Sequence, residues 1–269
     1  METFSGKFEE TPPVEKREII PQKLNKADVR GHRGVGKDET NAKKGEGMPR
    51  ENSLESLKRA VDFGVGIEFD VWQSEGELKL WHDDPENLKQ GDAGKYEKLA
   101  KLEEVFKMVA AYQEANPDKP KVPLDIEVKD LQAAQGVMEM LKNYAQLLGP
   151  QTKIISFDLI TLEGVDKMRK DGFVDIDTGF LYEHKPEKGK PASEDPIAIA
   201  KQIGAKYIIP DHKLLELSDE DLLSFVDRAA KEGVGIGTWT VDSLEEAERL
   251  KGAGIKSITT NEPEKFFGD

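Results

Sequence analysis

Cysteine is absent from this chain of 269 residues, so composition alone excludes disulfide bonds, thiolate catalysis and cysteine-based zinc sites. Long apolar runs are missing too. No stretch approaches the roughly 20 apolar residues of a membrane-spanning helix, and we expect no stable membrane insertion. The first residues lack the apolar core of a signal peptide. A cytoplasmic location is therefore expected, while an exported form whose signal has been removed stays open.

Positive charge is scarce relative to negative charge. The chain has 39 lysine and arginine residues against 53 aspartate and glutamate residues, a formal net charge of −14. Nucleic-acid binding normally needs a basic surface, so we expect no nucleic acid partner. A small anionic substrate remains compatible with this charge, because local cations and a metal ion can reverse the field inside one pocket. Composition leaves the oligomeric state open.

Strand and helix patterns alternate along most of the chain. Helices are predicted to start near residue 53 and to span 99–115, 131–148, 159–170, 196–203, 219–232 and 242–251. Strands are predicted near 28–34, 65–72, 122–129, 153–157, 178–182, 207–210, 235–241 and 255–260, with a hairpin arm at 77–82. About eight strand–helix units close a parallel barrel. We therefore predict an α/β fold, a single-domain (β/α)8 TIM barrel over residues 27–269, behind a polar N-terminal extension at 1–26.

Two carboxylates lie side by side on one predicted strand. Glu68 and Asp70 are two residues apart, so both side chains project to the same face, while Phe69 and Val71 project to the other. Bare carboxylates on an inward face need a compensating charge, and a hard divalent cation, Ca²⁺ or Mg²⁺, suits an oxygen-rich cluster. A solvent-facing edge strand is the alternative, but a barrel strand has no free edge. We predict a site for one divalent metal ion.

The next predicted strand repeats this alternation. Asp125, Glu127 and Lys129 share its inner face. Glu127 is a candidate third metal ligand beside a lysine that would hold phosphate. A structural salt bridge between Glu127 and Lys129 is the alternative interpretation.

Two of the four histidines, His32 and His82, end predicted strands beside the acidic residues. A single histidine is more often a hydrogen-bonded packing residue, so it is the pairing that favours catalysis. A pKa near 6.5 suits proton transfer at neutral pH, with one histidine donating while the other accepts. Arg33 presents a guanidinium suited either to a phosphate oxygen or to bracing the barrel mouth. His184 and His212 are expected in solvated loops.

Six short motifs then follow one another along the chain: Gly31-His32-Arg33-Gly34, Glu51-Asn52-Ser53, Glu68-Phe69-Asp70, His82-Asp83, Ile126-Glu127-Val128-Lys129 and Trp239-Thr240-Val241. In this order they resemble the glycerophosphodiester phosphodiesterase family, from about residue 28 to residue 263. The resemblance implies a barrel that hydrolyses glycerophosphodiesters to sn-glycerol 3-phosphate and an alcohol with one divalent metal ion.

The resemblance also implies a role for each matching residue. The implied metal ligands are Glu68, Asp70 and Glu127. The implied acid–base pair is His32 and His82. The implied phosphate- and substrate-binding residues are Arg33, Lys129, Glu51, Asn52 and Trp239. In the family, the attack on phosphorus comes from the neighbouring glycerol hydroxyl and gives a cyclic phosphate that water opens.

Three departures from the family pattern bear on substrate identity. The segment between His32 and Glu51 is longer than usual, Pro85 begins a different sequence after the second histidine, and Asn261 stands where aspartate is more frequent. One alternative is a phospholipase D-like or lysophospholipase D activity on lipid headgroups. An apolar entrance would favour it, and the lysine-rich segment 35–50 does not resemble one. The other is a non-catalytic barrel that binds a phosphorylated ligand, which predicts loss of a histidine or carboxylate. The alcohol, the metal and the histidine that acts as base stay open.

Overall fold

The computed structural model describes residues 17–36, 48–145, 151–183 and 195–268. Parallel strands pair in the order β1-β9-β8-β7-β6-β5-β4-β2, and a β1–β2 pairing closes the ring. The strands are β1 (Val29–Gly31), β2 (Gly66–Ser74), β3 (Glu77–Leu80), β4 (Leu124–Val128), β5 (Lys153–Ser156), β6 (Asp177–Tyr182), β7 (Tyr207–Pro210), β8 (Gly235–Thr238) and β9 (Ser257–Thr260). Strand β3 pairs antiparallel with β2 as the predicted hairpin arm. The predicted TIM barrel is confirmed.

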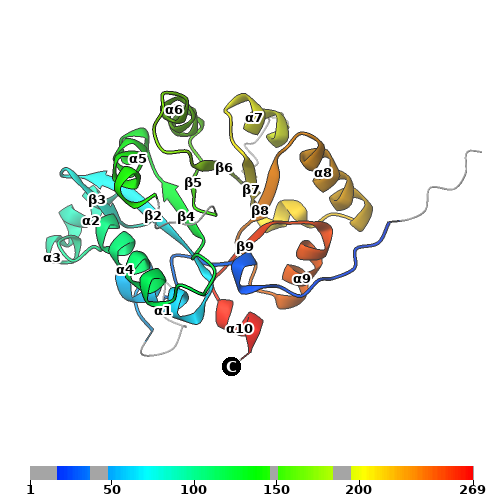
Figure 1. The fold of residues 1–269 in the computed structure, drawn as a ribbon, viewed down its shortest axis with the longest axis horizontal. Helices are drawn as coiled ribbons and strands as arrows, with labels where there is room; N and C mark the ends of the chain where they lie inside the picture. The colour runs from blue at the N-terminus through cyan, green and yellow to red at the C-terminus, as the bar shows by residue number, and fades with distance from the viewer. Residues whose placement is uncertain (1–16, 37–47, 146–150, 184–194, 269) are drawn as a thin grey trace, which may run out of the picture.

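Helices surround the strands as an outer ring (Figure 1). They are α1 (Leu54–Phe63), α2 (Pro85–Gly91), α3 (Ala93–Tyr96), α4 (Leu102–Ala115), α5 (Leu131–Tyr144), α6 (Leu159–Lys170), α7 (Pro196–Gln202), α8 (Asp219–Lys231), α9 (Leu244–Ala253) and α10 (Pro263–Phe267), with 3-10 turns η1 (Lys26–Asp28) and η2 (His212–Leu215). No helix within the described ranges is long and apolar enough to cross a bilayer.

Short polar side chains begin most of these helices. Ser53, Asp130, Asp158, Ser218 and Ser243 each accept a hydrogen bond from a backbone N–H of the first turn of α1, α5, α6, α8 and α9. Such caps satisfy N–H groups that have no partner within the helix, and each contributes about 1 kcal/mol. Ser53 and Ser218 cap the helices predicted to start near residue 53 and at residue 219, and Ser243 caps α9.

The core lies between the barrel and the helix ring. On β2, Ile67, Phe69 and Val71 are fully buried toward the helices, among them α1 with its buried Leu57 and Val61. Burial of each large apolar side chain contributes roughly 1.5–3 kcal/mol relative to exposure. The alternate residues of the same strand therefore face the barrel interior, as the strand period requires.

Three α-helices were not expected from the sequence. Helices α2 and α3 lie between β3 and α4, where Asp84 caps α2 ahead of Pro85 and Asp92 caps α3. Both are too short to give a helical hydrophobic period, as is α10 at the C-terminal end. Helix α4 begins at Leu102 instead of residue 99, because the Glu104 side chain accepts from the Lys101 N–H and fixes the start there. The predicted end of the helix after β4, at residue 148, lies outside the described residues.

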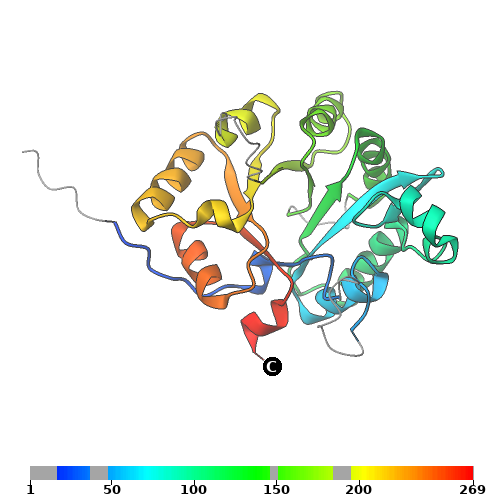
Figure 2. The same ribbon diagram turned by 180° about the vertical axis from the view of Figure 1, so that it is seen from behind.

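Residues 17–25 pack along the outside of the barrel, past α9 and α8 (Figure 2). The Ile19 N–H donates to Asp219 Oδ2 at 3.1 Å and the Gln22 N–H donates to the Glu248 carbonyl at 2.9 Å. Gly252 lacks the side chain that would collide with the Ile20 backbone. This part of the predicted extension is thus hydrogen-bonded to the helix ring.

Candidate active site

Three carboxylates from two neighbouring strands meet inside one mouth of the barrel. Glu68 and Asp70 come from β2 and Glu127 from β4, and the strand register pairs Asp70 directly with Glu127. All three are buried, and one oxygen of each lies within 4.8 Å of the others. Parallel strands end at the same face of a barrel, so their inward carboxylates converge there. The structure thus brings the three predicted metal ligands together.

The electrostatics of this trio favour a bound cation. Glu68 Oε1 is buried and has no hydrogen-bond partner among the residues that the structure describes. Burial, and then the charges of Asp70 and Glu127, raise the pKa of Glu68 well above its usual value. Burial and the Asp70 charge likewise raise the pKa of Glu127 to about 7. Buried carboxylates with raised pKa values require a proton or a cation. An oxygen-only donor set of this kind fits a hard divalent cation, and the metal's identity is left open.

Two basic side chains partly offset these charges. Lys129 Nζ lies 2.5 Å from Asp70 Oδ1 and is also ion-paired with Glu127. Arg33 Nε lies 3.4 Å from Asp70 Oδ2. Burial by itself would raise the pKa of Asp70, but Lys129 and Arg33 outweigh it and hold that pKa at about 2. The Glu127–Lys129 salt bridge considered as an alternative is present, and both residues also line an open cavity.

Glu51 and Asn52 stand behind this cluster. Asn52 is fully buried, donates to Asp70 Oδ2 at 2.7 Å and accepts from the Asp70 N–H at 3.1 Å. Glu51 accepts from Arg33 Nη1 at 2.8 Å. Neither residue is among those lining the cavity. The family resemblance implies that both residues bind substrate or phosphate; in the structure Asn52 contacts Asp70 and Glu51 contacts Arg33.

A hydrogen-bond chain fixes the ring of His32. Asn261 Nδ2 donates to Asp242 Oδ2 at 2.9 Å, so the Asn261 Oδ1 atom is the one that faces His32 Nδ1, at 2.8 Å. An amide oxygen only accepts, so Nδ1 carries the ring proton and Nε2 keeps a free lone pair. His32 Nε2 lies 3.9 Å from Glu68 Oε2. In the sequence Asn261 stands out only as a departure from the family pattern, and nothing local indicates this support.

The pKa of His32 is lowered to about 4, because the ring is buried and lies beside the Arg33 guanidinium. The imidazole is therefore neutral at pH 7 and can accept a proton at Nε2. His82 lines the same cavity but has a side chain that is 44 % exposed, with Nδ1 2.8 Å from Asp83 Oδ1. The two predicted acid–base residues thus share one cavity in different environments.

The rest of this cavity is mostly apolar, with Glu183 and Thr259 as its polar lining residues. Its volume is about 560 Å³, and the wall opposite the charged cluster consists of Ile155, Phe157, Leu181, Ile209 and Trp239. Ile155, Leu181 and Ile209 form a small buried cluster of their own inside β5, β6 and β7, with Trp239 packed against it. The Trp239 indole donates to the Ile209 carbonyl at 3.0 Å and meets the Phe157 ring edge-on at 5.6 Å.

Of these wall residues the sequence had indicated only Trp239. The others follow the same rule as the carboxylates, since they lie at or just beyond the carboxyl ends of their strands. Of the two remaining histidines, His184 lies outside the described residues. His212 begins η2 rather than a loop, and its side chain is 28 % exposed.

The fold is a (β/α)8 barrel, and its candidate active site combines buried carboxylates, two basic side chains and two histidines. Residues 32–265 match the "Glycerophosphoryl diester phosphodiesterase family", and the chain belongs to that family. The predicted membership is confirmed.

Relatives agree in sequence and fold. A glycerophosphodiester phosphodiesterase from Caldanaerobacter subterraneus subsp. tengcongensis is 27% identical over 81% of this chain and 90% of its own length. The crystal structure of a glycerophosphodiester phosphodiesterase from Parabacteroides distasonis has a TM-score of 0.65 at 23% identity, covering 90% of this chain and 95% of that one. An Oleispira antarctica phosphodiesterase, solved with the product sn-glycerol-3-phosphate, has a TM-score of 0.63 at 18% identity, covering 89% and 94%. These two structures share the barrel fold.

Proposed function

We propose that this protein is a metal-dependent phosphodiesterase that hydrolyses glycerophosphodiesters to sn-glycerol 3-phosphate and an alcohol. The observation that carries the proposal is the buried trio Glu68, Asp70 and Glu127 beside the Nε2 atom of a neutral His32, with Glu68 Oε1 lacking a hydrogen-bond partner among the described residues. We assign the activity to the barrel, residues 27–269. The trio would hold one divalent cation, Ca²⁺ or Mg²⁺, which when bound would stabilise negative charge on the phosphoryl oxygens.

The histidines would divide the proton transfers. His32 is neutral at pH 7 and has Nε2 free, so we assign it as the base that takes the proton from the attacking oxygen. His82 lies at the more exposed side of the same cavity and would protonate the departing alcohol. Microscopic reversibility exchanges these roles when water opens a cyclic phosphate. The Asn261–Asp242 pair supports this assignment because it keeps the proton of His32 on Nδ1.

The cations would position the phosphate. Arg33 and Lys129 line the cavity beside Glu68 and Glu127. Each already faces a carboxylate, so each has an orientation that is fixed before substrate arrives. Charge that grows on the phosphoryl oxygens would be stabilised without rearrangement of these side chains. Glu51 and Asn52 would act by holding Arg33 and Asp70 in place.

The direct test is the release of glycerol 3-phosphate from glycerophosphocholine and glycerophosphoethanolamine, with Ca²⁺ or Mg²⁺ and again with EDTA. We expect release with metal and none with EDTA. Release that is unchanged by EDTA would contradict the metal assignment. No release from folded protein with either metal would contradict the reaction and favour the non-catalytic phosphate-binding barrel.

A specific observation favours a second candidate, the lysophospholipase D activity on lipid headgroups. The apolar wall of Ile155, Phe157, Leu181, Ile209 and Trp239 offers a surface for an acyl chain next to the phosphate-binding cations. The sequence had suggested a polar entrance from segment 35–50, of which residues 37–47 lie outside the described residues. Assaying lysophosphatidylcholine beside glycerophosphocholine separates the two, since both carry the same headgroup.

A further inference from the structure

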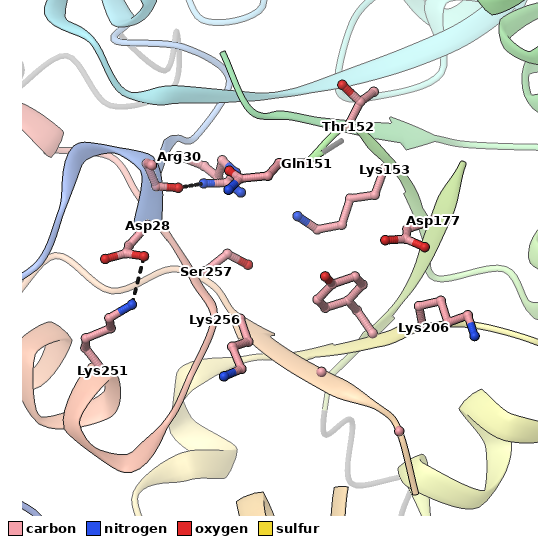
Figure 3. A pocket seen from close by; sticks show the side chains of 14 residues that line it. Asp28, Arg30, Gln151, Thr152, Lys153, Asp177, Lys206, Lys251, Lys256 and Ser257 are labelled. Carbon is pink, nitrogen blue, oxygen red and sulfur yellow. Dashed lines mark hydrogen bonds and ion pairs between the residues drawn. The ribbon is translucent and has the colours of Figure 1, made fainter. Parts of the chain in front are cut away.

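A second cavity occupies the opposite mouth of the barrel, where the strands begin (Figure 3). Its volume is about 440 Å³. The strand-start residues that line it are Arg30, Lys153, Asp177, Tyr207, Gly235 and Ser257. None of them lines the cavity that Glu68 and Glu127 line. The two cavities are therefore separate sites at the two ends of one barrel.

This mouth is cationic in a chain whose formal net charge is −14. Five basic residues line it: Arg30, Lys153, Lys206, Lys251 and Lys256. The lining carboxylates are Asp28, which is paired with Lys251 at 2.8 Å, and Asp177. Lys206 and Lys256 are exposed at the rim, and no carboxylate within the described ranges pairs with either of them. A positive cavity in an acidic protein focuses anions locally.

The excess of positive over negative charge extends into the buried floor of the cavity. Asp125 Oδ1 lies 2.5 Å from Lys153 Nζ and 3.2 Å from Arg30 Nε, so one carboxylate serves two cations. All three side chains are at most 5% exposed. A buried charge without a counter-charge is strongly unfavourable. Burial lowers the pKa of Lys153 to about 8, with Asp125 opposing the shift and Arg30 adding to it.

Some hydrogen-bond donors at the floor of the cavity have no acceptor among the described residues. An ammonium group has three N–H donors, and among the described residues only Asp125 accepts from Lys153. Ser257 is 4% exposed, and its hydroxyl has no hydrogen-bond partner in the described part of the chain. Figure 3 shows Lys153, Arg30 and Ser257 reaching toward the same open space from three different strands. These donors together fit an oxyanion.

We propose that this amino-terminal mouth is a binding site for a small phosphate dianion, either free phosphate or a small phosphate monoester. Lys153 and Arg30 are the buried anchors and Ser257 donates a further hydrogen bond. Lys206 and Lys256 attract the anion at the rim. The five basic side chains carry five positive charges, and the carboxylates of Asp28, Asp125 and Asp177 balance three of them. Two positive charges therefore remain for a dianion. The cavity is larger than a phosphate group and leaves room for a short organic moiety.

Isothermal titration of the full-length chain with inorganic phosphate at pH 7 tests this site. EDTA is present throughout, and sodium chloride keeps the ionic strength constant. Phosphate is expected to bind the wild type, and Lys153→Met should lower the affinity at least tenfold. Lys167→Met, an equal charge change on the exposed face of α6, should leave the affinity unchanged. Titration with glycerol 3-phosphate separates the sources: tighter binding than inorganic phosphate identifies a monoester site, and equal affinity identifies a phosphate site.

Two results would overturn the proposal. One is an unchanged phosphate affinity in Lys153→Met. The other is a result in which Lys129→Met loses phosphate binding while Lys153→Met binds phosphate as the wild type does. That result would locate the anion in the cavity beside Glu68 and Glu127. If Lys153→Met fails to fold, the exposed pair Lys206→Gln with Lys256→Gln replaces it. That variant should bind phosphate several-fold more weakly and with a smaller salt dependence, and an unaltered affinity would equally refute the site.

Discussion

The cavity beside Glu68 and Glu127 has two walls, which come from different strands of one barrel. The two walls differ in charge and in apolar character. The half formed by β1, β2 and β4 carries His32, Glu68 and Glu127 and is crowded with charge. The half formed by β5, β6 and β7 carries the buried Ile155, Leu181 and Ile209, and Glu183, directly after β6, is its charged lining residue. Both walls consist of inward residues near strand ends, so the barrel itself does not impose the difference.

This contrast separates chemistry from recognition. The charged wall holds the groups that can bind a cation, orient phosphate and move protons. The apolar wall can only offer surface, and it lies across the cavity from the charged cluster, where an acyl chain would pack. Changes to the first wall should therefore reduce turnover for every substrate, while changes to the second should discriminate between substrates.

The largest effect is expected at the histidines. His32→Ala and His82→Ala should each lower kcat by about 10²–10⁴-fold, because a positioned proton acceptor or donor is lost. Turnover of glycerophosphocholine with saturating metal is the measurement, with circular dichroism to verify the fold. Near-normal rates in both variants would refute the acid–base assignment.

Metal affinity should depend on pH through the carboxylate trio. Glu127 has a pKa raised to about 7 in the metal-free site, so below pH 7 a proton must leave before a cation binds. Affinity should therefore rise from pH 6 to pH 8, by up to about tenfold per pH unit for each proton released.

Calorimetric titration with Mg²⁺ or Ca²⁺ at three pH values measures this slope. Glu127→Gln should bind more weakly and with a shallower slope, since one titrating ligand is gone. A pH-independent affinity in the wild type would contradict the assignment of the trio as ligands.

A smaller effect is expected at Asn261, which acts on His32 from behind. Asn261→Leu should lower kcat by roughly tenfold to a hundredfold with little change in KM, because the ring proton is no longer held on Nδ1. Asn261→Asp keeps an acceptor there and should retain most of the rate. Its carboxylate should raise the pKa of His32, so the acidic limb of the kcat/KM profile should move to higher pH. Equal rates in the leucine variant and the wild type would show that the contact has no catalytic role.

The smallest effect is expected at the apolar wall. Phe157→Ala should raise KM for lysophosphatidylcholine several-fold, consistent with about 1–2 kcal/mol of lost apolar contact, and leave KM for glycerophosphocholine within about twofold. Ile160→Ala, which truncates a side chain 67% exposed on α6, is the matched control and should change neither value. Equal changes for both substrates would mean that the wall does not recognise an acyl chain.

The sequence by itself determined the barrel and the charged wall. Alternation of carboxylates with Phe69 and Val71 can be read along a single strand, and the capping serines Ser53 and Ser218 mark helix starts locally. The family motifs that carry the trio, both histidines and both basic residues lie on β2 and β4 or just after β1, β3 and β4, so these residues can be predicted from the amino-acid sequence alone.

Only the tertiary structure decided which residues meet across strands. The apolar wall joins Ile155, Leu181 and Ile209, three residues from three strands that look like ordinary core positions in sequence. The support of His32 by Asn261 spans 229 positions, and the cationic mouth gathers strand starts from Arg30 to Ser257. Such contacts depend on barrel closure and strand register, which bring distant residues together with no local signal in the chain.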